Sequence, residues 1–260
     1  MNDLVTVEVI EEHVVLLTLN RKEAANALSS ALLDALTESL QQLKKQTQLR
    51  AVMITGSGEK AFCAGADLKE RKGMTNEQVV ETVEKIGDTI RLVEELPVPT
   101  IAVINGVAFG GGLELALACD LRVMNSNTKV GLTETSLAII PGAGGTQRLT
   151  RLVGLGQAKK MIFTAKPITA EKAREIGLVE EIAPLTDLMA SAEELCKLIA
   201  QNAPIALRQA KKAIQEGFNT SLSSGLEIER LCYQQTIPTE DRMEGLEAFK
   251  EKRKPVYKGK

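Results

Sequence analysis

The chain has 260 residues, 44% of them hydrophobic, and its 32 basic and 34 acidic side chains give a net charge of -2. A chain of this length and composition can bury a full core, which predicts a soluble globular protein of one large domain, alone or with an appendage. Because both charge signs are spread along the whole length, no broad electrostatic field favours nucleic acid or an anionic membrane as a partner.

The first predicted element is a β-hairpin at the N-terminus. Residues 5–10 and 14–19 alternate apolar and polar side chains with period two, and the polar residues 11–13 join them. Residues 1–10 alternate too strongly for a signal peptide. No apolar run approaches the roughly 20 residues that a membrane helix requires, so we expect a cytoplasmic location and no membrane attachment.

His13, in the predicted hairpin turn, is the only histidine of the chain. A Ser-His-Asp triad could form only around it, and zinc sites with paired histidines are excluded. The cysteines show no metal-ligand spacing and mostly lie among apolar residues, so we expect reduced core residues and no metal site. They are Cys63, Cys119, Cys196 and Cys232. The chemistry must therefore use carboxylates or the backbone.

Helices and strands alternate through the next part of the chain. Ser29 or Ser30 caps a helix that ends near residue 45, and the following segments predict a strand at 51–55, an amphipathic helix at 75–96 and a strand at 100–104. From about residue 190 only helices follow, at 188–202, 204–217, 221–235 and 239–252. We predict an α/β core domain over 1–195 and a C-terminal helical region over 196–260.

The strand at 51–55 is followed by a glycine pattern that suggests a nucleotide site. Gly56, Gly58 and Ala61 have the spacing G-x-G-x-x-A of dinucleotide-binding folds. That fingerprint requires a long helix directly after it, whereas the next residues are small and broken by glycine. The pattern therefore disfavours NAD binding, and residues 64–66 offer bare backbone amides in a tight turn.

Three consecutive glycines, Gly110 to Gly112, lead from a predicted strand into an apolar helix. Without side chains they let a ligand approach the backbone, and their N–H groups at a helix N-terminus favour negative charge. Glu114 lies in the first turn of that helix. Burial would raise the pKa of this carboxyl and the helix dipole would lower it, so the net sign stays open. Glu114 is either functional or merely a favourable helix N-terminal acid that points outward.

Glu134 lies in a second apolar stretch punctuated by glycines. It is either functional or an ordinary acid in the first turn of a short helix capped by Thr133. Residues 142–145 could be only a turn into a helix at 146–153. Two bare-backbone segments and two carboxylates in apolar surroundings fit one reaction, in which N–H donors polarise a thioester carbonyl while acid/base groups act on adjacent carbons.

At these residues the sequence resembles the crotonase (enoyl-CoA hydratase/isomerase) superfamily from end to end. The motifs are A-F-C-A-G-A-D-L-K-E from Ala61, A-F-G-G-G-L-E-L-A-L-A-C-D from Ala108 and I-P-G-A-G-G-T-Q-R-L from Ile140. The resemblance implies a spiral of repeated ββα units with a C-terminal helical region that mediates trimers, commonly paired into hexamers.

The resemblance also implies roles for individual residues. Ala66 and Gly111 would supply the oxyanion-hole N–H groups, Glu114 would activate a water for attack at C3, and Glu134 would protonate C2. Having both glutamates favours a hydratase, because related isomerases usually lack the first. Coenzyme A would be part of the substrate rather than a separate cofactor. Implied contacts to it come from Ala24, Ala25, Ala27, Ala64, Asp67, Leu68, Lys69 and Gly110, and from Phe249 and Lys252 of a neighbouring subunit.

Within the superfamily, A-G-A-D-L-K-E-R and C-Y-Q-Q-T-I-P-T look most like methylglutaconyl-CoA hydratases of leucine breakdown. Ala143 is instead the residue that straight-chain hydratases carry, so the acyl group, short or branched, stays open. The alternatives are an enoyl-CoA isomerase and a CoA- or RNA-binding scaffold without catalysis. Some methylglutaconyl-CoA hydratases bind RNA through a lysine-bearing helix, to which Lys44 and Lys45 are a weak match. We therefore do not predict nucleic-acid binding.

Overall fold

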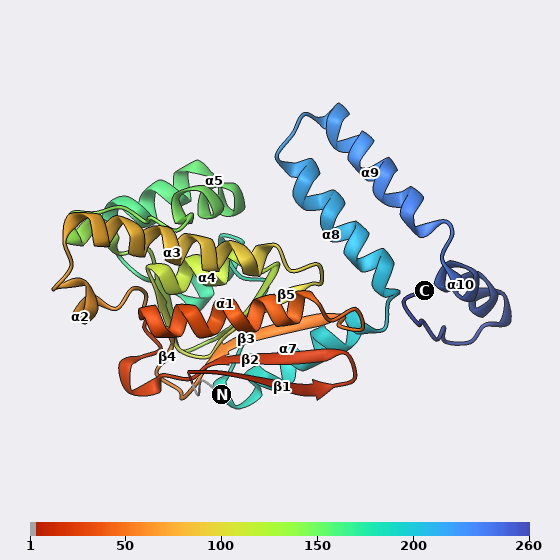
Figure 1. Cartoon of the computed structure of the whole chain (residues 1–260), viewed down its shortest axis with the longest axis horizontal. Helices are drawn as coiled ribbons and strands as arrows, with labels where there is room; N and C mark the ends of the chain where they lie inside the picture. The colour runs from red at the N-terminus through yellow and green to blue at the C-terminus, as the bar shows by residue number, and fades with distance from the viewer. Residues whose placement is uncertain (1–3) are drawn as a thin grey trace.

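The computed structural model describes residues 4–260, so the first three residues of the predicted core domain lie outside the described part. Its strands form a six-stranded sheet of order β1-β2-β3-β5-β7-β10 and a four-stranded sheet of order β4-β6-β8-β9 (Figure 1). Neighbours are parallel except in the pairs β1–β2 and β8–β9. The strands are β1 (Val5–Glu11), β2 (Val14–Leu19), β3 (Ala51–Gly56), β4 (Ala61–Cys63), β5 (Thr100–Ile104), β6 (Val107–Phe109), β7 (Leu121–Asn125), β8 (Lys129–Gly131), β9 (Ile168–Thr169) and β10 (Glu181–Ala183).

From β3 to β8, successive strands alternate between the two sheets, which confirms the predicted spiral of ββα units. Each of β3, β5 and β7 in the large sheet is followed by β4, β6 or β8 in the small one, and then by helical structure. The α-helices are α1 (Ser30–Lys44), α2 (Leu68–Arg71), α3 (Asn76–Glu94), α4 (Gly111–Ala118), α5 (Gly145–Thr164), α6 (Ala170–Glu175), α7 (Leu185–Ala200), α8 (Pro204–Phe218), α9 (Leu222–Thr236) and α10 (Glu240–Glu251). Two short 3-10 helices are η1 (Lys22–Ala24) and η2 (Glu134–Leu137).

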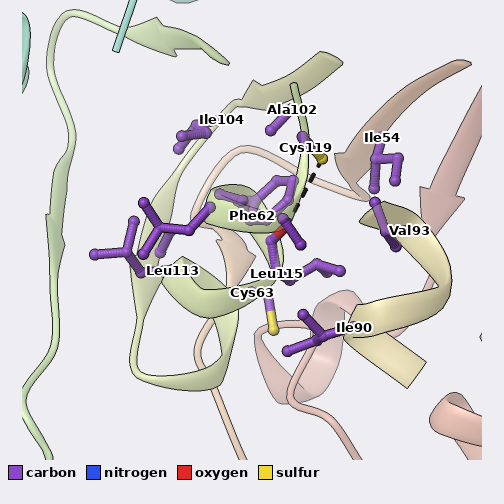
Figure 2. Packing of buried hydrophobic residues seen from close by; sticks show 14 of the residues in the cluster. Ile54, Phe62, Cys63, Ile90, Val93, Ala102, Ile104, Leu113, Leu115 and Cys119 are labelled. Carbon is purple, nitrogen blue, oxygen red and sulfur yellow. Dashed lines mark hydrogen bonds between the residues drawn. The ribbon is translucent and has the colours of Figure 1, made fainter. Parts of the chain in front are cut away.

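The large sheet is covered on both faces. Along β3, Val52 and Ile54 belong to the core beneath α1, α3 and α4, whereas Ala51 and Met53 pack on the side of α7. This alternation is the period of two that a strand imposes, and apolar residues at every position match a strand buried on both faces. Figure 2 shows the fully buried Phe62 of β4 among side chains of α3 and α4, so the helix that carries Glu114 is part of the core.

The C-terminal helices stand apart from the sheets. The pair α8–α9 projects from the core in Figure 1, and α10 lies beyond its base. The predicted boundary between residues 195 and 196 falls inside α7, whose Leu188, Ala192 and Cys196 all pack against the large sheet. The helices that leave the sheets begin with α8, and the division of the chain into two domains stays a prediction. Among residues 4–260 no helix combines the length and apolarity needed to cross a bilayer.

Candidate active site

A cavity of about 540 Å³ lies between α2, α3, α4 and the segment that contains η2. Its charged wall residues are Arg71, Glu114 and Glu134. Predicted site residues Ala64, Ala66, Leu68, Gly110 and Gly111 line the same cavity as the two glutamates. The apolar part of the wall comes from Val79, Val83 and Ile86 of α3 and from Leu137, Ile139 and Ile140.

The first turn of α4 buries the Glu114 side chain, which is 3% exposed. A Cβ on Gly112 would overlap the carbonyl oxygen of Cys63, so the glycine lets α4 begin directly against β4. The carboxylate oxygen Oε1 of Glu114 accepts hydrogen bonds from the backbone N–H groups of Ala143 at 2.8 Å and Gly145 at 2.7 Å. The alternative of an outward-pointing helix acid is therefore wrong.

Burial decides the sign of the Glu114 pKa that the sequence left open. Loss of water raises the pKa, and this outweighs the two amide hydrogen bonds and the positive charge of Arg148, which lower it. A carboxyl with a raised pKa binds protons more strongly, so its ionised form is a better general base near neutral pH.

Glu134 reaches the cavity from η2. Thr133 occupies the N-cap position of η2, but its side chain accepts no capping hydrogen bond within residues 4–260, so the predicted side-chain cap is wrong. Oxygen Oε2 of Glu134 is buried and has no hydrogen-bond partner within residues 4–260. Burial, followed by the negative charge of Glu114, raises the pKa of Glu134 to about 7, although the nearby Arg71 lowers it. Glu134 can therefore carry a proton near neutral pH.

Two backbone segments meet beside these carboxyls. A Cβ on Gly111 would lie 3.7 Å from the nitrogen of Ala66, and one on Gly65 would lie 3.3 Å from the nitrogen of Gly111. Gly65 has φ +95°, a backbone conformation that is strained for a residue with a side chain. Within residues 4–260, neither the N–H of Ala66 nor that of Gly111 donates a hydrogen bond. Two unpaired donors thus lie close together at the cavity wall, as an oxyanion site requires.

The segment that contains Ala24, Ala25 and Ala27 braces this arrangement from behind. The carbonyl of Ala25 accepts from the N–H of Ala64 at 3.0 Å, and the N–H of Leu28 donates to the carbonyl of Gly65 at 2.8 Å. None of the three alanines lines the cavity. Their contact with coenzyme A therefore stays a prediction.

The carboxylate of Asp67 is occupied by protein groups. Its Oδ2 accepts from Arg21 at 2.6 Å, and its Oδ1 accepts from the N–H groups of Lys69 at 2.9 Å and Glu70 at 3.3 Å, which caps α2. These bonds hold its pKa below the usual range even though burial opposes them. Asp67 thus fixes the loop after Ala66, and coenzyme A contacts by Asp67 and Lys69 remain predictions.

Phe249 and Lys252 do not join the site of their own chain. They lie in and just after α10, at the opposite end of the molecule from α2 in Figure 1, and Phe249 is 87% exposed. Their predicted contact with the ligand of a neighbouring subunit remains a prediction.

The structure adds two arginines that the sequence analysis did not identify as site residues. Arg71 lines the cavity, and Arg148 contacts the loop that holds Glu114. Arg71 stands in a run of charged residues, which is typical of an exposed segment. It lies three residues after Leu68 in α2, however, and this spacing places both side chains on one helix face. Within residues 4–260 no cluster of His, Cys, Asp and Glu could hold a metal ion.

Known proteins resemble the chain over nearly its whole length. A family model described as enoyl-CoA hydratase/isomerase matches residues 9–260. YngF of Bacillus subtilis, whose name places it among enoyl-CoA hydratases/isomerases, is 56% identical over 259 residues, which cover 100% of both chains. Human mitochondrial methylglutaconyl-CoA hydratase is 47% identical over 95% of this chain and 74% of its own length. A crystal structure of an enoyl-CoA hydratase from Bacillus anthracis superimposes with a TM-score of 0.98 at 53% identity, covering 99% of this chain and 100% of that one. The chain is therefore an enzyme of the enoyl-CoA hydratase/isomerase family, the crotonase family.

Proposed function

We propose that the enzyme is a hydro-lyase that adds water across the C2=C3 double bond of an enoyl-CoA thioester. The observation that carries this proposal is the convergence, on one cavity, of two carboxyl groups with raised pKa and two unpaired backbone N–H donors. An acyl-CoA thioester is the substrate type of the family.

The reaction follows from the arrangement of these groups. The N–H groups of Ala66 and Gly111 bind the thioester oxygen and draw electrons from the double bond. Glu114 takes a proton from water as the water oxygen attacks C3, and the C2=C3 electron pair moves toward the thioester oxygen to give an enolate. Glu134 then donates its proton to C2 as the carbonyl re-forms.

We further propose that the acyl group is short and branched and carries a free carboxylate in addition to the thioester, as in methylglutaconyl-CoA. Arg71 is the cation of the cavity wall, its Nε is buried without a partner, and its guanidinium makes no ion pair within residues 4–260. A carboxylate at the far end of the substrate would satisfy it through charge-assisted hydrogen bonds. The 47% identity to human, mouse and rat methylglutaconyl-CoA hydratases supports the same substrate.

Replacement of Glu114 by Gln tests the hydratase proposal. The amide cannot accept a proton from water, so kcat for hydration should fall at least about 100-fold. Loss of enoyl-thioester ultraviolet absorbance measures the rate, and calorimetric binding of a saturated acyl-CoA provides the control that the site is intact. Near-normal hydration by Glu114→Gln would refute the proposed role.

The two alternatives, an isomerase and a non-catalytic scaffold, can be distinguished by absorbance assays. An isomerase would convert a 3-enoyl-CoA to the 2-enoyl isomer without water uptake, and a non-catalytic scaffold would bind acyl-CoA without loss of absorbance.

We also propose that the chain assembles into a homotrimer or a dimer of trimers, because the helices α8 to α10 expose many large apolar side chains. Sedimentation equilibrium would measure the assembled mass against the 28.1 kDa of one chain. The cytoplasmic location stays a prediction that cell fractionation would test.

A further inference from the structure

The loop that holds the Glu114 carboxylate is itself held by Arg148. Ala143 donates its N–H to Oε1 of Glu114, and its carbonyl accepts from Nη1 of Arg148 at 3.0 Å. A Cβ on Gly144 would overlap the same guanidinium nitrogen, and Gly144 has φ +100°, so the loop backbone lies directly against Arg148. One residue, Ala143, therefore connects the guanidinium to the carboxylate.

Glu94, the last residue of α3, fixes the other side of the guanidinium. Its Oε2 accepts from Nη2 of Arg148 at 2.6 Å and from Nε at 3.2 Å. The Arg148 side chain is 19% exposed and that of Glu94 is 42% exposed. All three guanidinium nitrogens thus donate hydrogen bonds to the protein, two of them to Glu94 and one to the loop. A lysine cannot reproduce this forked geometry.

The charged groups around Glu114 come from few elements. Arg148 of α5 favours its ionised form and Glu134 of η2 lies close enough for the two carboxyls to interact. The nearby wall of α3 is apolar, and β4 contributes the buried thiol of Cys63, whose pKa burial raises to about 12. The positive charge of Arg148 therefore lowers the pKa of Glu114, whereas that of Arg71 in α2, on the same cavity, lowers the pKa of Glu134.

We propose that Arg148, oriented by Glu94, is a positioning residue that holds the Ala143 and Gly145 amides on Glu114 and so sets the direction and ionisation of this carboxylate. The inference rests on the proposed hydratase function. It differs from a merely structural role, in which the ion pair would only join α3 to α5 and leave the titration of Glu114 unchanged.

Arg148→Met should lower kcat for crotonyl-CoA hydration by about tenfold to a hundredfold, because small displacements of a catalytic group are costly, with little change in the binding of a saturated acyl-CoA. The acid limb of the pH–rate profile should move to higher pH, since loss of the positive charge raises the pKa of Glu114.

Arg148→Lys should keep the acid limb near its original position yet recover only part of kcat. Glu94→Gln should lower kcat in the same direction while leaving Arg148 in place.

Arg151→Met is the matched control, because Arg151 lies on the same helix and, among the described residues, bonds only to Gln147. It should leave kcat and the pH profile unchanged. Folding is checked by circular dichroism for every variant. An Arg148→Met or Glu94→Gln protein that is folded and has the kcat and acid limb of the original enzyme would overturn the inference.

A second readout separates this inference from the proposed function. Carbon-13 titration of labelled glutamate carboxyls, with the Glu114 signal identified by its loss in Glu114→Gln, reports the pKa without turnover. A higher pKa in Arg148→Met supports the positioning role even if no enoyl-CoA is hydrated, whereas an unchanged pKa contradicts it even if hydration is fast.

Discussion

Arg71 lies where it can act on the substrate and on the acid that protonates it. Replacing it by Met should reduce kcat/KM for methylglutaconyl-CoA by about tenfold to a hundredfold, because hydrogen bonds to a charged group contribute about 1.5–3 kcal/mol. The acyl group of crotonyl-CoA has no free carboxylate, so kcat/KM for crotonyl-CoA should fall much less. The control is Lys72→Met, a cation next in sequence that does not line the cavity. Equal losses for both substrates would contradict the assignment of Arg71 to the acyl carboxylate.

The pH dependence of hydration should report Glu134. As a general acid it must carry a proton, and its pKa is raised to about 7, so kcat/KM for crotonyl-CoA should fall as pH rises through about 7. The apparent value belongs to the interacting pair of glutamates. Because the charge of Arg71 lowers the pKa of Glu134, Arg71→Met should move this alkaline limb to higher pH. The measurement is a pH–rate profile at constant ionic strength, and a flat profile across neutrality would contradict the acid role.

The sequence could name the two glutamates, and the family resemblance their expected roles, but neither gave their pKa values. The net pKa of Glu114 depends on how much water the folded core excludes, and no local pattern gives that quantity. Glu134 presented an ordinary helix-start pattern, and its raised pKa comes from burial and from Glu114, which is 20 residues away in sequence. The roles of Arg71 and Arg148 could not be predicted, because they depend on the folded cavity and on partners such as Glu94 that are distant along the chain.

Among the elements, the junction of α4 with β4 controls the position of the site. Gly112→Ala should destabilise the protein by about 3 kcal/mol or more, the upper part of the range for overpacking, because the new Cβ meets the backbone of Cys63 rather than a movable side chain. The gain in helix propensity, at most about 1 kcal/mol, is too small to offset this. Urea denaturation measures the change in the free energy of unfolding.

Gly73→Ala is the matched control for that substitution. A Cβ on Gly73 would meet no atom of the described part of the chain within 4 Å, and the φ of Gly73 is not positive, so the stability should change little. If Gly112→Ala were as stable as Gly73→Ala, the contact between α4 and β4 would not be as close as described.

Element boundaries were predictable where the local chemistry is explicit. Ser29 caps α1, and Thr75 and Gln78 form a capping box that starts α3. The helix predicted at 146–153 matches the first part of α5, up to the kink at Gly154. Gly154 has φ +79° and breaks the local helical pattern, yet α5 resumes beyond it because Ala158 and Met161 pack into the core. Local propensity ends at the glycine, whereas tertiary packing continues the element.

At the scale of the whole molecule, the sequence indicated alternating strands and helices but not which strands pair. β3 lies between β2 and β5, and β7 pairs with β10 from about 60 residues further along the chain. The spiral was predicted through the family motifs, since strand order follows from contacts that periodicity does not encode. For the same reason, nothing local distinguishes α7, which covers the sheet, from α8, which leaves it.

The projecting C-terminal helices lead to a prediction about the assembled enzyme. Phe249 belongs to α10, at the opposite end of the molecule from α2, and does not line the cavity, so in the proposed trimer it should serve the site of a neighbour. Phe249→Ala alone should raise KM for the acyl-CoA, and Glu114→Gln alone should lower kcat at least about 100-fold. When the two variants are co-expressed, mixed trimers contain sites with Glu114 from one subunit and Phe249 from the other, and these sites should regain the original low KM. The control replaces Phe249→Ala by Phe163→Ala, an exposed aromatic residue of α5, which should have a normal KM without mixing. Activity of the co-expressed pair equal to the sum of the two separate variants would mean that Phe249 does not act across subunits.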